Sequence, residues 1–215
     1  MIPLVHDMSG ETVLVFGGGP VGARKARRFA RETRTVVVSP EFADREFGEA
    51  ELVRAAPAPE DVADWVDRFD PVLVVAATND TDVNDAVVAA ARDAGAMVNR
   101  ADKSGSRDAG SVVVPATIED GDVSVAITTG GASPALSKYL RERIEAELDG
   151  AGAMADLTAD LRAELKESDR TPAERRAAIR AVVRDPSVWK ALRTGDANPR
   201  REAARVITNT QRGDS

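Results

Sequence analysis

The sequence predicts an α/β fold: a doubly wound parallel sheet, then a small α+β domain, then a helical C-terminal tail. Three observations lead to this prediction. Strand-like and helix-like segments alternate with short connections over the first hundred residues, which is typical of a parallel sheet covered by helices. Two closely spaced strand-like segments follow, and every later segment has helical composition. We expect domains over residues 1–110, 111–150 and 151–215.

The first expected domain alternates brief apolar strands with helices that are richer in alanine and charged residues. The segment Val72–Ala77 is a continuous apolar run, as for a strand that is buried on both faces. Gly95 stands where a helix would end. The expected strands are Thr12–Phe16, Thr35–Val38, Leu52–Ala55, Val72–Ala77 and Ala96–Asn99, and the expected helices are Val21–Arg31, Asp61–Phe69 and Asp82–Ala94.

The pattern changes after a polar, glycine- and serine-rich loop over residues 101–110. Strands are expected over Ser111–Pro115 and Val123–Thr128, and the turn Glu119–Asp122 between them indicates an antiparallel pair. A long helix then runs from Pro134 to about Leu148, with Ser133 as its N-cap. From Ala151 onward the composition is helical, with breaks near 168–172, 185–186 and 195–199.

Composition excludes several kinds of chemistry. Among its 215 residues the chain has no cysteine and a single histidine, His6. A disulfide framework, a thiolate zinc site, a cysteine nucleophile and a multi-histidine metal site are therefore excluded. If the chain is an enzyme, carboxylates or a cofactor must carry its reaction, and we expect no resident metal.

The charge distribution argues against nucleic acid as a partner. The net charge is −7, with 26 acidic and 16 basic side chains over residues 1–150 and 10 and 13 over residues 151–215. A nucleic-acid binder would normally present a basic face.

The longest apolar run falls far below the roughly 20 residues that span a bilayer. The first residues lack the basic and apolar regions of a signal peptide, so we expect a cytoplasmic protein.

The strongest local signal is the segment Gly17-Gly18-Gly19-Pro20-Val21-Gly22, which fits G-x-G-x-x-G between a strand and a helix. Gly17 would permit the tight turn, Gly19 the approach of a pyrophosphate, and Gly22 close packing of helix on strand. The start of the helix, at Pro20 and Val21, would present its free N–H groups and its positive dipole end to the phosphates. An ordinary glycine turn is the alternative. The strand–turn–helix context favours a Rossmann-like, dinucleotide-binding domain.

Polar residues at two further strand ends would complete a cofactor site. Glu41 and Ser39 follow the second strand and would bond the ribose hydroxyls, although Glu41 could equally be a helix-start carboxylate. No arginine follows at once to pair a 2′-phosphate, although Arg45 is not far away, so the sequence favours NAD over NADP. Thr78 offers a hydroxyl beyond the buried strand, and it or Asp80 could simply cap the next helix.

Two later segments suggest a substrate side to this site. Asp102 follows the next strand, where a carboxylate could take a proton while a hydride leaves for a nicotinamide; a solvated loop aspartate is the alternative. Thr128, Thr129, Gly130, Gly131 and Ser133 join a strand to a helix. Their hydroxyls and the helix N–H groups would cradle an anion, and a plain capped helix start is the alternative.

These segments resemble one family when they are taken together. The start PLVHDMSGETVLVFGGGPVGARKARRF, the segment AATND, the segment VNRAD and the segment AITTGGASPALSKYLRERIE occur in the order and spacing of the precorrin-2 dehydrogenase family, the N-terminal module of sirohaem synthase. The resemblance runs from Ile2 to about Leu148, and the helical tail looks like the family's third, less distinctive part.

The resemblance implies NAD-dependent oxidation of precorrin-2 to sirohydrochlorin by a homodimer. It implies a Rossmann-like domain, a dimerisation domain at 111–150 and a helical tail. The family's catalytic aspartate matches Asp102, in a segment that departs from the family pattern at Arg100, Ala101 and Lys103. The substrate carries many carboxylates, and we expect cations and helix N-termini to hold them. The expected groups are Arg100, Lys103, Arg107, arginines of the tail and the loop Thr128, Thr129, Gly130, Gly131 and Ser133.

Two other functions stay open at this point. Some relatives also insert ferrous iron, so the chain could be a bifunctional dehydrogenase and ferrochelatase. With one histidine and no cysteine, any iron handling would use carboxylates, water or the nitrogens of the substrate. A non-catalytic NAD-sensing domain would explain the glycine turn but not the AATND, NRAD and TTGGASP segments together.

Overall fold

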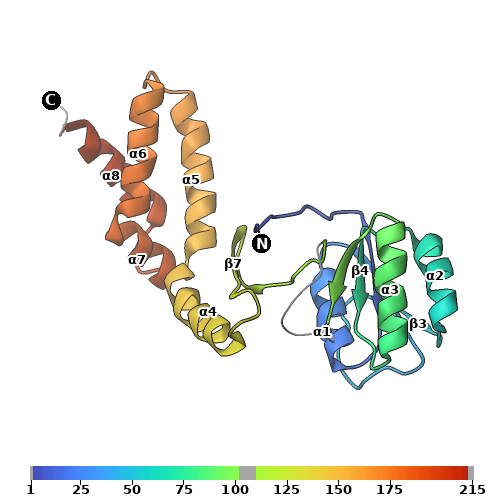
Figure 1. The fold of residues 1–215 in the computed structure, drawn as a ribbon. Coiled ribbons are helices and arrows are strands. Elements are labelled where there is room, and N and C mark those ends of the chain that lie inside the picture. The colour runs from blue at the N-terminus through green and yellow to red at the C-terminus, as the bar shows by residue number, and fades with distance from the viewer. Residues whose placement is uncertain (1, 102–109, 213–215) are drawn as a thin grey trace. The chain divides into compact units, whose positions relative to one another are not determined.

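The computed structural model describes residues 2–101 and 110–212, and it divides into two compact units (Figure 1). Unit 1 comprises Met1–Val114 with Gly130–Ala132, and unit 2 comprises Pro115–Thr129 with Ser133–Ser215. None of the helices in the described ranges is both long and apolar enough to cross a bilayer. The three-domain division predicted above remains a prediction.

Unit 1 is the predicted doubly wound parallel sheet. Its strand order is β3-β2-β1-β4-β5, and all four strand pairs are parallel. The chain moves outward from β1 through β2 to β3, and then crosses back to add β4 and β5 on the other side of β1. The elements are β1 (Thr12–Phe16), α1 (Pro20–Phe29), β2 (Arg34–Ser39), β3 (Glu51–Arg54), η1 (Pro59–Asp61), α2 (Val62–Phe69), β4 (Leu73–Ala76), α3 (Thr81–Asp93) and β5 (Met97–Arg100).

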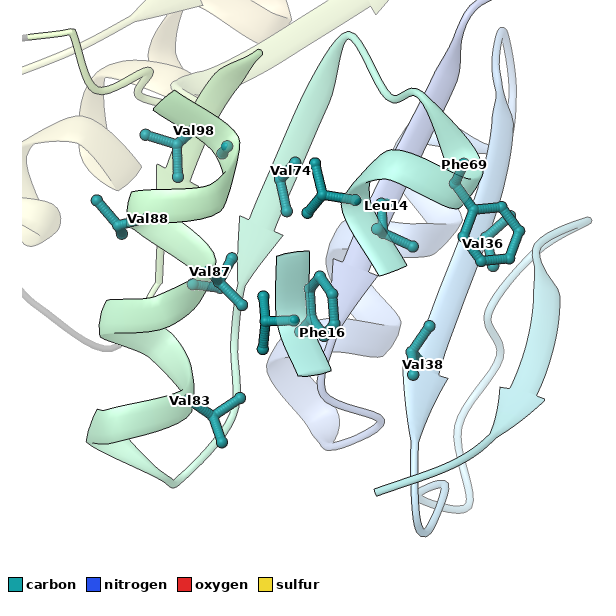
Figure 2. Close-up of a cluster of buried hydrophobic side chains, with 14 residues drawn as sticks. Leu14, Phe16, Val36, Val38, Phe69, Val74, Val83, Val87, Val88 and Val98 are labelled. Atoms are coloured by element: carbon teal, nitrogen blue, oxygen red, sulfur yellow. The ribbon is translucent and has the colours of Figure 1, made fainter. Parts of the chain in front are cut away.

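Alternate residues of the central strands bury opposite faces of this sheet, as the twofold strand period requires. In β1, Leu14 and Phe16 pack in a cluster with side chains of α2 and α3 (Figure 2). Val13 and Val15 pack on the other face with residues of α1. All four side chains are fully buried, and each contributes about 1.5–3 kcal/mol to the free energy of unfolding. This core fixes the strand ends that carry the site.

Unit 2 begins with an antiparallel hairpin, as predicted, but its first strand is not where the sequence placed it. The strand β6 covers Ala116–Asp120 rather than Ser111–Pro115, and β7 covers Val123–Ile127. Asp120 pairs with Val123, so the turn has only two residues, and Gly121 adopts the positive φ of 54° that such a turn needs. The earlier segment lies instead beside β5, where the Val112 amide donates to the Val98 carbonyl at 2.7 Å.

Helices make up the rest of unit 2, as predicted. Most begin at a proline in the first turn, which suits the missing N–H and fixed φ of that residue. Ser133, Thr171 and Asp185 cap three of them by accepting hydrogen bonds from backbone amides. The helices are α4 (Pro134–Leu148), α5 (Ala151–Lys166), α6 (Pro172–Arg184), α7 (Pro186–Thr194) and α8 (Pro199–Arg212). A cluster of apolar side chains from α5 to α8 forms their shared core.

Candidate functional site

The glycine turn after β1 lies at the point where the strand order reverses, between the carboxyl ends of β1 and β4. Gly17 has φ of +113°, which side-chain-bearing residues rarely adopt, and its amide donates to the Val38 carbonyl at 3.0 Å. A Cβ at Gly17 would lie 2.3 Å from the Ala77 carbonyl oxygen. Ligands of open α/β sheets bind at this kind of switch point.

Two other glycines of the turn are required by the chain itself. A Cβ at Gly22 would lie 1.8 Å from the Gly17 carbonyl oxygen, so α1 packs against the turn that precedes it. The sequence suggested packing of helix on strand, and the nearest strand atom is the Val15 Cγ1 at 3.8 Å. Sequence reasoning gave no role to Gly18, yet a Cβ there would lie 2.3 Å from the Glu41 carbonyl oxygen.

Gly19 differs from these neighbours because, in the described part of the chain and apart from its two chain neighbours, no atom lies within 4 Å of the position its Cβ would take. Its φ of −73° is ordinary, so the chain itself does not require glycine there. Gly19 is the N-cap of α1, no side chain caps the helix, and its first turn holds no acidic residue. Pro20 has no N–H, and the amides of Val21 and Gly22 are the first that the helix directs outward. This open, uncapped helix start fits the pyrophosphate of a dinucleotide.

Ser39 and Glu41 lie beside this turn, at the end of β2. Ser39 is 6% exposed, and its hydroxyl donates to the Glu41 carbonyl at 2.7 Å. The Glu41 side chain is exposed, and its backbone carbonyl is the atom that a side chain on Gly18 would meet. The serine hydroxyl therefore shapes the loop, while the Glu41 carboxylate faces solvent. Ribose binding by either side chain remains a prediction.

Thr78, beyond β4, is held by a residue that the sequence did not single out. Asn84 of α3 is 1% exposed, and its Oδ1 accepts from the Thr78 amide at 3.2 Å and from the Thr78 hydroxyl at 2.8 Å. Its Nδ2 donates to the Thr78 carbonyl at 3.0 Å. Asp80, not Thr78, caps α3 by accepting from the amides of Asp82 and Val83. Asn84 thus fixes the loop that touches Gly17, and a polar residue on a helical face gives no sequence signal of this.

The end of β5 carries Arg100, which is in register with Ala76 of β4 at the same edge of the sheet. Its guanidinium is paired with the Asp85 carboxylate of α3, and the side chain is 11% exposed. Asn99 precedes it, 2% exposed, with Nδ2 donating to the Val112 carbonyl at 2.6 Å. Its Oδ1 is the buried side-chain atom that lacks a hydrogen-bond partner within the described ranges. Asp102, Lys103 and Arg107, predicted as catalytic and substrate-binding residues, lie outside the described residues.

The predicted anion cradle of Thr128, Thr129, Gly130, Gly131 and Ser133 is organised around the start of α4. Thr129 Oγ1 donates to the Ser133 carbonyl at 3.1 Å and accepts from the Ser133 amide at 3.2 Å. Ser133 Oγ accepts from the Leu136 amide at 3.2 Å. Gly130 and Gly131 both have positive φ, 66° and 88°. The capped helix start is therefore present, and anion binding by this loop stays a prediction.

Comparison with known proteins agrees with this geometry. A family model described as "Putative NAD(P)-binding" matches residues 4–116, and one described as "Sirohaem biosynthesis protein central" matches residues 120–147. The precorrin-2 dehydrogenase of Methanosarcina barkeri is 32% identical over 200 residues, which cover 87% of this chain and 85% of that protein. A solved structure of SirC, a precorrin-2 dehydrogenase, matches with a TM-score of 0.68 over 97% of this chain and all of the other, at 24% identity.

Longer proteins match as well. The siroheme synthase of Stutzerimonas stutzeri is 35% identical over 207 residues, but the match covers 91% of this chain and 42% of that protein. The chain thus spans about two fifths of that longer relative, and 85% of the shorter Methanosarcina barkeri protein. With its sheet, its glycine turn and these matches, the chain belongs to the precorrin-2 dehydrogenase family.

Proposed function

We propose that this chain catalyses the NAD-dependent dehydrogenation of precorrin-2 to sirohydrochlorin, a step of sirohaem biosynthesis. The observation that carries the proposal is the open face of Gly19 at an uncapped helix start, in a chain that is 32% identical to the precorrin-2 dehydrogenase of Methanosarcina barkeri. The overall change removes two hydrogens from the macrocycle: one leaves as a hydride and the other as a proton. When bound, NAD supplies the hydride acceptor.

The residues around the glycine turn would hold the cofactor. Gly19 gives the pyrophosphate room, and the outward amides of Val21 and Gly22 supply hydrogen bonds and the positive end of the α1 dipole. Gly17, Pro20 and Gly22 keep that helix start in place. Because the Ser39 hydroxyl donates within its own loop and the Thr78 hydroxyl donates to Asn84 of α3, we assign both to shaping the site, with Glu41 facing the ribose.

Asp102 is our candidate for the group that takes the proton, since it comes two residues after β5 in the sequence, and β5 ends at the same edge of the sheet as β4, beside the glycine turn. The substrate carboxylates would be held by cations and helix amides. Arg100 is already paired with Asp85, so a substrate carboxylate would have to share its guanidinium with that partner or replace it. Lys103 and the loop Thr128–Ser133 remain candidates for the other contacts.

The working form that we propose is a cytoplasmic homodimer, joined through the hairpin and α4. A two-stranded sheet is marginally stable by itself. The helix α4 has no buried residue in the single chain, and its Leu136 and Tyr139 are 46% and 54% exposed. Burial of these side chains against a second copy would give the hairpin and α4 more apolar packing than they have in the single chain.

An absorbance assay with enzymatically made precorrin-2 tests the proposal. We expect NADH and the sirohydrochlorin spectrum to appear together, in equal amounts and without added iron. A parallel reaction with ferrous iron shows whether the chain also inserts the metal. Binding of NAD without any oxidation of precorrin-2 would refute the dehydrogenase and favour a non-catalytic NAD-sensing domain.

A further inference from the structure

The end of β2 is where a dinucleotide site of this fold distinguishes NAD from NADP. A carboxylate there accepts hydrogen bonds from the ribose 2′-hydroxyl, whereas a nearby arginine accommodates a 2′-phosphate. In this chain β2 ends at Ser39, which is not acidic and whose hydroxyl is engaged with the Glu41 carbonyl. The side chain that would repel a 2′-phosphate most directly is therefore missing from the strand end.

An arginine reaches the same place from the neighbouring strand. Arg54 is the last residue of β3 and is in register with Ser39. Its Nη1 donates to the Pro40 carbonyl at 2.9 Å, and its guanidinium carbon lies 5.6 Å from the centre of the Phe42 ring. These two contacts hold the positive charge over the loop that follows β2. Within the described part of the chain they use one of the five guanidinium N–H donors, so the others can take an anion.

This loop is joined directly to the glycine turn. The Ala43 amide donates to the Gly18 carbonyl at 2.8 Å, and Gly18 is closely approached by Glu41, Phe42 and Ser39. The charge of Arg54 is thus held on the segment that packs against the predicted pyrophosphate site. Glu41, exposed on the same loop, is the opposing charge nearby.

From this geometry we propose that the site also binds NADP, and that Arg54 is the residue that receives its 2′-phosphate. The proposal rests on the dinucleotide site of the proposed function and deepens it. A planar guanidinium binds phosphate oxygens through two parallel hydrogen bonds, which suits a group presented beside the ribose. NAD lacks this phosphate, so its binding depends much less on Arg54.

The test measures dissociation constants of NAD and NADP by calorimetry on the full chain, with no turnover required. We expect NADP to bind the wild-type protein within about tenfold of NAD, and Arg54→Gln to weaken NADP by about tenfold or more. NAD should change by less than about threefold in the same variant. The NADP effect should shrink as salt is raised, because salt screens an exposed charge pair.

Arg34 offers a matched control on the same two strands. It begins β2, its Nη2 lies 3.1 Å from the Glu51 Oε2, and its guanidinium carbon lies 5.7 Å from the centre of the Phe69 ring. Like Arg54, Arg34 makes one polar contact and one ring contact, so Arg34→Gln removes a similarly held arginine at the opposite end of these strands. It should leave both dissociation constants unchanged.

The outcomes separate this inference from the proposed function. Binding of NAD but not NADP would overturn the role of Arg54 and leave the dehydrogenase standing, and failure to bind either nucleotide would overturn both. Equal weakening of NAD and NADP by Arg54→Gln would show that Arg54 only supports the loop. Should that variant fail to fold, Arg54→Lys replaces it: charge is kept and the planar fork is lost, and NADP should still weaken more than NAD.

Discussion

Gly19→Ala is the substitution that best tests whether the glycine turn is a binding site rather than an ordinary turn. Apart from its two chain neighbours, the added methyl group meets no atom of the described residues within 4 Å, and the φ of −73° suits alanine. Replacing glycine by alanine at a compatible position stabilises a protein by about 0.4–1 kcal/mol, because the unfolded chain loses freedom. We therefore expect a variant that folds as well as the wild type or slightly better. The same methyl group would occupy the space that a pyrophosphate needs.

The matched variant is Gly22→Ala, three residues along the same turn. There the methyl carbon would lie 1.8 Å from the Gly17 carbonyl oxygen, so α1 or the turn must move. Overpacking of this kind costs about 1–3 kcal/mol or more. At about 2–4 °C per kcal/mol for a chain of this size, the melting temperature should fall by several degrees.

Calorimetry with NAD and thermal unfolding without it distinguish the two effects. Gly19→Ala should keep its melting temperature and lose at least about tenfold in NAD affinity, because the displaced phosphate forfeits hydrogen bonds to helix amides. Gly22→Ala should lose stability first. If Gly19→Ala binds NAD as tightly as the wild type, the pyrophosphate does not approach this backbone, and the open face of Gly19 has another explanation.

Three further predictions concern other parts of the chain. Asn84→Ala removes the partner of the Thr78 amide and carbonyl. The free energy of unfolding measured in urea should therefore fall by about 2–4 kcal/mol, and NAD should bind more weakly. An unchanged affinity for NAD would count against the positioning role of Asn84. Asp102→Ala should lower turnover by about 10²–10⁴-fold and spare NAD binding; full activity would remove it from the mechanism. Hydrogen bonds from the Ser187 hydroxyl and amide lower the pKa of Asp185 in the folded chain. This contribution to the free energy of unfolding should be present above the ordinary pKa of aspartate and lost as the pH falls through the lowered pKa, which unfolding measured at a series of pH values would show. Ser187→Ala should reduce that loss.

Much of the fold follows from local patterns that the structure keeps. The parallel sheet, the glycine turn after β1 and the helical tail could all be predicted, because each depends on short-range periodicity and on proline and glycine positions. The strand expected at Ser111–Pro115 was wrong because Ser111–Pro115 and Ala116–Asp120 are both plausible strands in isolation. Pairing decides which of the two segments forms the first strand of the hairpin. Asp120 pairs with Val123 across a two-residue turn, whereas the Val112 amide bonds to the carbonyl of Val98 in β5.

The site shows a similar limit. Gly17, Gly19 and Gly22 could be found from their spacing, whereas Asn84 and Arg54 could not. Asn84 reaches Thr78 because a helix returns over a strand end, and Arg54 reaches the loop after β2 because β3 pairs with β2. Arg54 stands fifteen positions beyond Ser39 in the sequence, and nothing in the sequence pattern between them indicates that the two residues are neighbours in space. The preference for NAD over NADP was inferred from the residues next to Ser39 alone, and the strand pairing adds a cation that this inference did not include.

The hydrogen bonds around the site indicate which parts of a dinucleotide would be bound by backbone amides and which by side chains. The Ser39 hydroxyl donates within its own loop and the Thr78 hydroxyl donates to Asn84 of α3, so the groups left for the pyrophosphate are the backbone amides beside Gly19. Backbone donors do not depend on side-chain identity, and substitutions nearby should matter only when they add bulk or move the turn. Side-chain control of the cofactor is then confined to the ribose end, where Glu41 and Arg54 oppose each other. Charge changes at that end should alter the choice between NAD and NADP more than they alter turnover.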